Sequence, residues 1–253
     1  MALTYHINYT DKQEFKTYRD ILPEEDPDDA AFVEIMKKID EYTMTVRDGL
    51  EATYSLFQAV KYLAQNRIAG DIVECGVWRG GSMMLVAHAL QHFGDSSREL
   101  YLYDTFAGMT EPEDVDIDMD GNPMKPFWEQ ARRDGKVIGF GGVLDEVMSN
   151  LRGTGYPEAQ TFFVEGDVLE TIPAYLPERI ALLRLDTDWY KSTFHELTHL
   201  YDLLVPNGVL IVDDYGWNKG SRKATDDFFR ARAFRPLMHR VDEKVRMLVK
   251  PVS

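Results

Sequence analysis

Two kinds of hydrophobic pattern alternate along the chain from Gly70 onward. The short runs are apolar and rich in β-branched and aromatic residues, which is typical of buried strands. They cover residues 71–75, 99–104, 161–165, 180–186 and 208–214. Apolar residues at helical spacing fill about residues 81–93, 142–152, 168–175, 190–204 and 219–231. This alternation predicts a doubly wound, Rossmann-like α/β fold, with a mostly parallel sheet and helices on both faces.

The two ends of the chain depart from this alternation. Residues 1–30 are polar and acidic, which indicates an arm outside the central core, and helical patterns follow at about 30–42 and 46–65. Residues 233–252 hold two β-like runs without a helical pattern between them, so we expect a C-terminal antiparallel hairpin. We therefore divide the chain into an N-terminal arm and helix, residues 1–45, and a main domain, residues 46–253.

The longest connection, at about residues 107–142, separates the second predicted strand from the helix that follows it. It is rich in Asp, Gly, Pro and Met. Connections of this length inside a domain are usually functional lids or disordered segments. We interpret this segment, called the lid below, as a cover over a binding site.

Composition and charge narrow the possible partners and the compartment. The 253 residues carry 28 Lys and Arg against 43 Asp and Glu, a formal net charge of −15, which repels a nucleic-acid backbone. The single cysteine, Cys75, allows no intrachain disulfide, and we expect a cytoplasmic location. The chain starts without a signal-peptide pattern, and no apolar run approaches the roughly 20 residues of a membrane span. We therefore expect neither a nucleic acid nor a membrane as a partner.

A glycine-rich segment joins the first predicted strand to its helix, with the sequence Glu74-Cys-Gly76-Val-Trp-Arg-Gly80-Gly81-Ser82. Glycines there allow a tight turn and a close approach of the backbone to a ligand, and free N–H groups at a helix start favour an anion. In an open α/β sheet this is the ligand crevice. The spacing Gly-x-x-x-Gly-Gly argues against a nicotinamide dinucleotide, which favours Gly-x-Gly-x-x-Gly. The alternative is an ordinary glycine turn without a ligand.

Asp104 ends the second predicted strand, within Leu-Tyr-Asp-Thr-Phe. A carboxylate at this position can accept both hydroxyl protons of a ribose, as in nucleoside-binding α/β domains. It therefore indicates a nucleoside-containing cofactor. Alternatively, Asp104 caps the turn that follows it.

Three aspartates end two other predicted strands, Asp186 after one and Asp213 and Asp214 after the next. Neighbouring parallel strands lie about 4.8 Å apart, so these carboxylates should converge at the carboxyl edge of the sheet. Three unpaired carboxylates would repel one another, and a hard cation such as Mg²⁺ relieves that repulsion. Alternatively, Asp213 and Asp214 are solvated turn residues, and Asp188 caps the helix that begins near Tyr190.

Two other candidate metal sites are weaker. The segment Asp116-x-Asp118-x-Asp120-Gly121 copies the start of a calcium-binding EF-hand loop, but Phe127 stands where that loop needs a glutamate. His195 and His199 lie one helical turn apart, yet the further ligands that a zinc site prefers are not nearby in the sequence. We therefore expect a calcium or zinc site at neither place.

Six short motifs occur together between residues 42 and 230. They are Thr43-Met44, the segment Gly70 to Ser82, Tyr103-Asp-Thr-Phe-x-Gly108, Leu183-Arg-Leu-Asp-x-Asp-x-Tyr190, Pro206-x-Gly208 and Ile211-Val-Asp-Asp-Tyr215. Their combination resembles the macrocin O-methyltransferase family, which includes the mycinamicin and novobiocin sugar methyltransferases. The resemblance implies a class I methyltransferase fold, with S-adenosylmethionine and Mg²⁺ as cofactors. It also implies a homo-oligomer and, as acceptor, a hydroxyl of a deoxysugar on a natural product or glycan.

Carried over residue by residue, the resemblance implies two sets of site residues. The cofactor would contact Thr43, Met44, Glu74, Gly76, Gly80, Ser82, Asp104, Thr105, Phe106, Gly166 and Asp167. The metal would be held by Asp186, Asp213 and Asp214, and Asp186 would also accept the proton of the acceptor hydroxyl. The lid and the first 40 residues do not match closely, and these parts would shape the acceptor pocket.

Three alternatives stay open. The same chemistry on a catechol or another phenol would use the metal to hold two adjacent oxygens of a more acidic acceptor. An oxidoreductase that uses a nicotinamide dinucleotide would share the glycine turn and Asp104 but would have no use for the three aspartates. A non-catalytic domain that kept the fold would not need them either.

Overall fold

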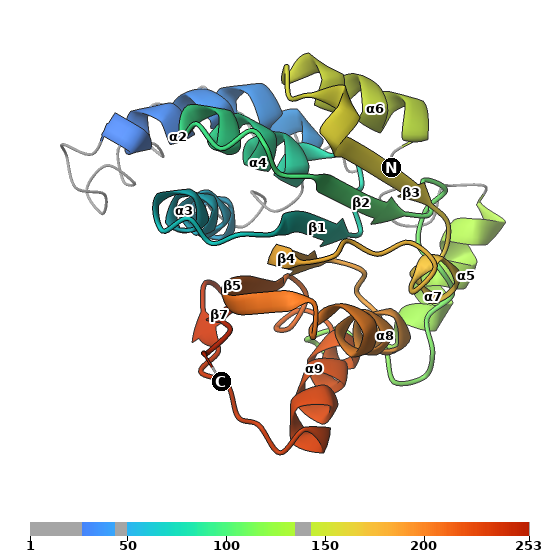
Figure 1. Cartoon of the computed structure of the whole chain (residues 1–253). Coiled ribbons are helices and arrows are strands. Elements are labelled where there is room, and N and C mark those ends of the chain that lie inside the picture. The colour runs from blue at the N-terminus through green and yellow to red at the C-terminus, as the bar shows by residue number, and fades with distance from the viewer. Residues whose placement is uncertain (1–26, 44–49, 135–142, 253) are drawn as a thin grey trace.

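The described strands form one mixed, seven-stranded sheet (Figure 1). The computed structural model describes residues 27–43, 50–134 and 143–252. Its strands are β1 (Asp71–Cys75), β2 (Leu100–Asp104), β3 (Thr161–Glu165), β4 (Ile180–Leu185), β5 (Leu204–Val212), β6 (His239–Arg240) and β7 (Arg246–Val249). Their order is β3-β2-β1-β4-β5-β7-β6, with β1 to β5 parallel and β7 antiparallel to both of its neighbours. The predicted doubly wound sheet and its C-terminal hairpin are confirmed.

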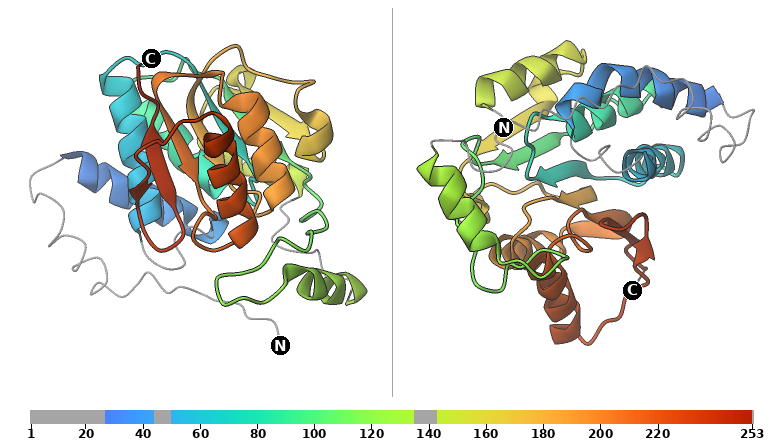
Figure 2. Two further views of the ribbon diagram at one scale, coloured as in Figure 1. Left: turned by 90° about the horizontal axis from the view of Figure 1, so that it is seen from below. Right: turned by 180° about the vertical axis from the view of Figure 1, so that it is seen from behind.

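Helices cover both faces of this sheet (Figures 1 and 2). One face carries α2 (Pro27–Ile39), α3 (Glu51–Gln65), α4 (Gly81–His92) and α6 (Leu144–Gly153). The other carries α7 (Val168–Thr171), α8 (Tyr190–Leu200) and α9 (Lys219–Ala231). Short 3-10 turns lie at η1 (Asp40–Tyr42) and η2 (Glu158–Gln160). Helix α5 (Met124–Arg133), from the lid, stands apart from these two layers (Figure 2).

Successive residues of a central strand enter different hydrophobic cores. In β1, Ile72 packs with residues of α2, α3 and α4, whereas Val73 and Cys75 pack with residues of α8 and α9. Because strand side chains point alternately to the two faces, a strand that is covered on both sides is apolar throughout. Strand β4 follows this rule except at Arg184, whose side chain is only 4% exposed. This buried charge needs partners, and it finds them at the site described below.

Three predicted helices differ from the observed ones by four residues or more at one end. Helix α3 begins at Glu51, and residues 46–49 of the predicted helix lie outside the described residues. Helix α7 ends at Thr171 instead of near residue 175, because Pro173 disfavours helical backbone at the residue before it. Helix α8 ends at Leu200 instead of near residue 204.

Strand β5 begins at Leu204, four residues before the predicted start. Leu204 pairs with Ile180 and Val209 with Leu182, so residues 205–208 stand opposite Ala181 alone. An irregularity of this kind accommodates Pro206, which has no N–H group for the ladder. Proline and glycine in this segment hid the start of the strand from the sequence pattern.

The described part of the lid, residues 107–134, is fastened to the body of the protein by a buried carboxylate. Asp116 is 1% exposed. Its Oδ1 accepts a hydrogen bond of 2.8 Å from the backbone N–H of Tyr190, and its Oδ2 accepts one of 2.7 Å from that of Glu113. The indole N–H of Trp189 donates to the carbonyl of Thr110 at 3.0 Å. The lid is therefore anchored at the start of α8, and residues 135–142 lie outside the described residues.

The same contacts separate the first two aspartates of the calcium-like segment. Asp116 points into the body, whereas Asp118 accepts hydrogen bonds from the backbone and side-chain nitrogens of Asn122 at 2.7 and 3.0 Å. The two carboxylates are thus used separately instead of converging on one ion.

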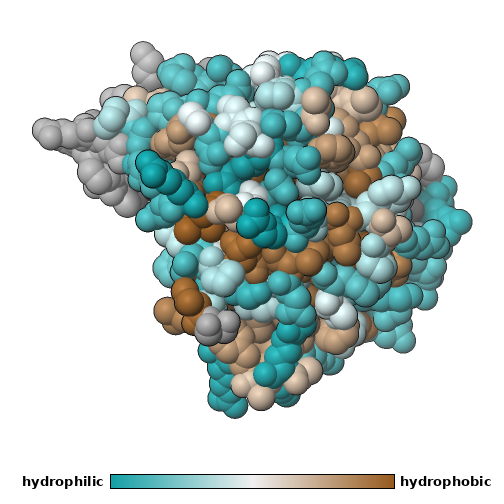
Figure 3. Space-filling model, in the orientation of Figure 1, coloured by the Kyte–Doolittle hydropathy of each residue, from teal (hydrophilic) through white to brown (hydrophobic). Residues whose placement is uncertain are grey.

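The surface reflects the acidic, polar composition. On the face shown in Figure 3, hydrophilic side chains surround a band of apolar ones at the level of the sheet in Figure 1. The helices above and below the band turn polar residues outward, as expected of helices that pack on a core through one face. Within residues 27–43, 50–134 and 143–252, no helix is long and apolar enough to cross a membrane.

The anchor of the lid leads to a test of stability at Gly220. A Cβ atom at Gly220 would lie 1.9 Å from Oδ1 of Asp116 and 2.9 Å from Oδ1 of Asn218. Because Asp116 cannot move away without losing its hydrogen bonds, we expect Gly220→Ala to lower the free energy of unfolding by about 1–3 kcal/mol. Chemical denaturation measures this change. Gly153→Ala is the control, since a Cβ there would meet nothing within 4 Å, and equal stability of both variants would contradict the prediction.

Candidate active site

A pocket of about 760 Å³ opens at the carboxyl ends of β1, β2, β3 and β4. Strand β1 has β2 on one side and β4 on the other, so the strand order reverses there. Ligands of open α/β sheets bind at such a point. The lining residues come from the loops after these strands and from the lid, and they are Gly76, Trp78, Tyr103, Asp104, Thr105, Gly108, Met109, Thr110, Gly166, Asp167, Val168, Asp186, Thr187, Asp188, Trp189 and Ser192.

Close backbone contacts require glycine in the loop between β1 and α4. Gly76 has φ of +84°, and a Cβ there would lie 2.0 Å from the carbonyl oxygen of Asp186. A Cβ at Gly81 would lie 2.4 Å from the backbone of Tyr42. These positions therefore let the loop approach β4 on one side and the segment at Thr43 on the other. Among the described side chains, none caps the start of α4, which leaves its first N–H groups for a ligand.

Asp104 joins the two loops that flank the pocket. Its Oδ2 accepts hydrogen bonds from the backbone N–H groups of Val77 and Trp78 at 2.6 and 3.1 Å. Its Oδ1 accepts one from the backbone N–H of Phe106 at 2.8 Å. Burial raises the pKa of Asp104, and these three amides lower it in part. Asp104 thus does cap the following turn, while Oδ1 keeps acceptor capacity for a ligand hydroxyl.

Carboxylates hold the strained backbone around the pocket. Trp78, Phe106 and Asp188 have φ angles of 48°, 49° and 63°, in the left-handed region that costs a non-glycine residue about 1 kcal/mol or more. Asp104 accepts from the amides of the first two, and Oδ2 of Asp214 accepts from the amide of Asp188 at 3.1 Å. The shape of the pocket therefore depends on these two acidic side chains.

The predicted cofactor residues fall into three groups. Gly76, Asp104, Thr105, Gly166 and Asp167 line the pocket. Thr43, Glu74, Ser82 and Phe106 are buried and do not line it, and Gly80 is the residue before α4. Asp167 also caps α7 by accepting a hydrogen bond of 2.9 Å from the N–H of Leu169. Met44 lies outside the described residues.

The three predicted metal residues come together at this edge of the sheet. Leu185 of β4 pairs with Val212 of β5, so the residues that follow them lie side by side. Asp186, Asp213 and Asp214 each offer a carboxylate oxygen, and these oxygens lie within 4.8 Å of one another. All-oxygen ligands at this spacing suit a hard divalent cation.

Arg184 is the partner that sequence reasoning missed. Its Nη1 lies 2.5 Å from Oε1 of Glu74 and 2.7 Å from Oδ2 of Asp186, and its Nη2 lies 2.6 Å from Oδ1 of Asp213. The signal for it was present, because a single arginine in an apolar strand must find carboxylates when it is buried.

Asp188 is a fourth carboxylate of this cluster and not a helix cap. Helix α8 begins after Trp189, and the side chain that accepts a hydrogen bond from the N–H of its first residue, Tyr190, is Asp116 and not Asp188. Burial, and next the charge of Asp186, raise the pKa of Asp188 to about 8. Burial and neighbouring carboxylates raise the pKa of Asp213 to about 7 and that of Asp214 well above its usual range. The ionised cluster is thus unfavourable by itself, and its donor atoms fit a divalent cation that would offset the repulsion.

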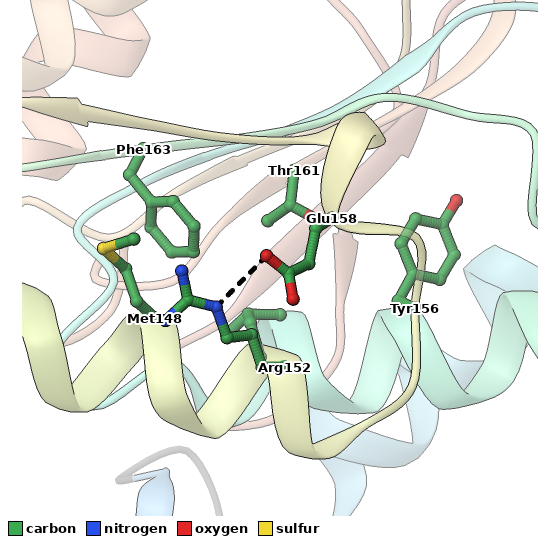
Figure 4. A pocket seen from close by; sticks show the side chains of 7 residues that line it. Met148, Arg152, Tyr156, Glu158, Thr161 and Phe163 are labelled. Carbon is green, nitrogen blue, oxygen red and sulfur yellow. Dashed lines mark ion pairs between the residues drawn. The ribbon is translucent and has the colours of Figure 1, made fainter.

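A second hollow, of about 390 Å³, lies between α6 and β3 (Figure 4). Its one acidic residue, Glu158, faces Arg152 across the hollow at 3.3 Å. None of the predicted site residues lines it. We therefore assign the chemistry of the protein to the first pocket.

The sheet order, the glycine loop after β1 and the pocket at the strand ends define a class I S-adenosylmethionine-dependent methyltransferase. Residues 37–248 match the macrocin-O-methyltransferase (TylF) family, and the chain belongs to that family. This confirms the resemblance that the motifs indicated, and it identifies the protein as an O-methyltransferase.

Two relatives and one solved structure illustrate the similarity. A rhamnosyl-tetracenomycin-C 4'-O-methyltransferase from Streptomyces olivaceus is 32% identical over 71% of this chain and 66% of its own length. Mycinamicin III 3''-O-methyltransferase from Micromonospora griseorubida is 31% identical over 74% of this chain and 72% of its own length. The chain thus spans about two thirds of the length of these relatives. The structure of the O-methyltransferase NovP superposes with a TM-score of 0.72 and 26% identity, covering 83% of both chains.

A buried glutamate beneath the pocket leads to a pH-dependent prediction. Glu196 of α8 is fully buried and accepts hydrogen bonds from the hydroxyl of Thr187 at 2.9 and 3.1 Å. Burial raises its pKa from 4.5 to about 8. The folded state therefore binds a proton that the unfolded chain releases, so the stability from this group is complete below pH 4.5 and is lost as the pH rises toward 8.

We expect Glu196→Gln, which cannot ionise, to become more stable than the natural protein by roughly 1–2 kcal/mol or more between pH 5 and pH 8.5. Urea denaturation across this pH range measures the difference. Glu170→Gln, at an exposed glutamate of α7, is the matched control. A pH-independent difference for Glu196→Gln would show that this carboxyl is ionised in the folded protein.

Proposed function

We propose that this protein transfers the methyl group of S-adenosylmethionine to a sugar hydroxyl of a natural product or glycan, with Mg²⁺ held by Asp186, Asp213 and Asp214. The observation that carries the proposal is the convergence of these carboxylates within 4.8 Å, beside a pocket of which Asp186 is a wall. The sugar acceptor is supported by the relatives, whose names specify methylation of a rhamnosyl tetracenomycin and of mycinamicin III.

The cofactor would occupy the pocket between the glycine loop and the Gly166-Asp167 turn. The uncapped start of α4 would receive its carboxylate. Oδ1 of Asp104 would accept a hydroxyl proton of its ribose. Thr43 and Met44, Gly80 to Ser82 and the segment from Thr105 to Phe106 would complete the surroundings, as in the family pattern.

The acceptor is the difficult partner, because a sugar hydroxyl has a pKa of roughly 15, close to that of water. A bound divalent cation would supply positive charge that favours loss of the hydroxyl proton, while S-adenosylmethionine would supply the methyl group. The chain itself would fix the acceptor oxygen near the cofactor, and such positioning accounts for much of the rate in enzymes. The lid residues Gly108 to Thr110 line the pocket, so we propose that the lid covers the reacting groups.

Two carboxylates are candidates for the general base that accepts the proton of the acceptor hydroxyl. Asp186 takes this role in the family pattern, in addition to its role as a ligand. Asp188 lines the same pocket and is not one of the three ligands, so a cation would not draw electron density from it directly. This geometry favours Asp188 as the general base and Asp186 as a ligand.

A catechol or phenol acceptor stays the closest alternative, and the sugar-specific names of the relatives argue against it. A nicotinamide-dependent oxidoreductase would leave the carboxylate cluster without a role. The division of the chain at residue 45, the cytoplasmic location and self-association stay predictions.

The first test of this function removes one metal ligand at a time. We expect Asp213→Asn to lower turnover at least about a hundredfold while S-adenosylhomocysteine binds within about tenfold of its normal affinity, because the ligand acts on the acceptor and not on the cofactor. Mass spectrometry of a panel of deoxysugar glycosides and catechols measures turnover, and calorimetry measures binding. Asp202→Asn, at an exposed ion pair with Arg232, is the control. Full activity with excess chelator would contradict the role of the metal.

A second test separates ligand from base. We expect Asp188→Asn to lower kcat by about 10²–10⁴ and to leave Mg²⁺ affinity within about tenfold, because a general base contributes to proton transfer alone. Asp186→Asn should weaken both. If Asp188→Asn kept full kcat, the proton would go to Asp186 or to another group.

A further inference from the structure

Arg184 places a permanent positive charge beside the proposed cation site. If its only role were to balance the carboxylates, this position would be unfavourable, because the arginine would also repel the cation. Its guanidinium is within 2.7 Å of Asp186 and within 2.6 Å of Asp213, two of the three carboxylates that converge there. Arginine stays charged at any pH at which proteins fold, so it repels a divalent cation at all times. Charge balance alone therefore does not account for its position.

The geometry of the contacts supplies that reason. Arg184 binds Oδ2 of Asp186 with one nitrogen and Oδ1 of Asp213 with the other. Each aspartate thereby has one oxygen fixed and keeps the second as a possible ligand. A guanidinium is planar and presents its donors in a rigid fork, so it sets the relative orientation of the two carboxylates.

Glu74 fixes the arginine in turn. Its Oε1 accepts from Nη1 of Arg184 at 2.5 Å, and the side chain is 1% exposed. Its Oε2 is buried and has no hydrogen-bond partner among the described residues. Glu74 is the last residue but one of β1, the strand that leads into the glycine loop, and it lies two residues before Gly76. The guanidinium of Arg184 is therefore held between Glu74, near the glycine loop, and the two aspartates Asp186 and Asp213.

We propose that Arg184 is a positioning residue, anchored by Glu74, that sets Asp186 and Asp213 in the geometry that a divalent cation needs. This inference rests on the proposed function in assuming a cation at these aspartates. Mg²⁺ demands near-octahedral coordination, so its affinity is sensitive to how the ligands are oriented. Hydrogen-bond partners that orient metal ligands typically contribute 10–100-fold to affinity.

The two possible roles of Arg184 predict opposite signs. If it only repels the cation, Arg184→Gln tightens Mg²⁺ binding. If it orients the carboxylates, Arg184→Gln weakens Mg²⁺ binding despite the loss of positive charge. Arg184→Lys keeps the charge and loses the fork, so a positioning role again predicts weaker binding.

The experiment is calorimetric titration of MgCl₂ into the full-length protein without cofactor or acceptor, with circular dichroism to establish folding. We expect Arg184→Gln and Arg184→Lys each to weaken Mg²⁺ binding about 10–100-fold. The matched control is Arg98→Lys, at another buried arginine that pairs with Asp95 at 2.6 Å and donates to the carbonyl of Gly70 at 2.6 Å. Gly70 precedes β1, so this arginine lies at the opposite end of the strand, and its variant should bind Mg²⁺ within twofold of the natural protein.

Unchanged or tighter binding in a folded Arg184 variant would overturn the proposal. If neither Arg184 variant folds, Glu74→Gln decides the matter, because it removes the anchor and keeps the arginine. Weaker Mg²⁺ binding in Glu74→Gln supports the proposal, and natural affinity overturns it. Absence of Mg²⁺ binding by the natural protein itself would instead refute the metal site under the proposed function.

Discussion

The negative charge gathered at the carboxyl edge of the sheet is the constraint on which this protein depends. Parallel strands end side by side, so Asp186, Asp213 and Asp214, which follow β4 and β5, are forced into one small volume. Burial and neighbouring carboxylates raise the pKa of Asp213 and that of Asp214. Arg184 offsets part of this charge through three short ion pairs. The remainder is the basis of the divalent-cation site proposed above.

Acidic side chains also hold the backbone around the pocket in place through hydrogen bonds. Asp104 accepts from amides on both flanking loops, Asp214 accepts from the amide of Asp188, and Asp116 fastens the lid to the start of α8. Each of these carboxylates bonds backbone that would otherwise have unsatisfied donors or would relax out of a left-handed conformation. A composition with an excess of acid therefore serves the fold as well as the site. These acidic residues thus stabilise particular segments of backbone, which the net charge of the chain does not reveal.

Most of the fold could be predicted from local patterns. The strand at 71–75, the strand at 161–165 and the helix at 219–231 were predicted with their observed bounds, because long-range packing there agrees with strong local periodicity. Errors arose where single residues override a pattern. Pro173 ended α7 early, and the irregular segment around Pro206 concealed the first residues of β5. The lid gave no periodic signal, and helix α5 within it was not predicted.

The sequence by itself determined the sheet, the glycine loop and the convergence of Asp186, Asp213 and Asp214, since strand alternation and parallel pairing place residues that end neighbouring strands side by side. Only the tertiary structure decided which side chains meet across long distances in the chain. Glu74 and Arg184 are 110 residues apart, and Asp116 and Tyr190 are 74 apart, so no local pattern connects either pair. Asp188, predicted as a possible helix cap, joins the carboxylate cluster because a left-handed turn redirects it. Such contacts form only when separate helices, strands and loops pack together, so they cannot be read from the sequence near either residue.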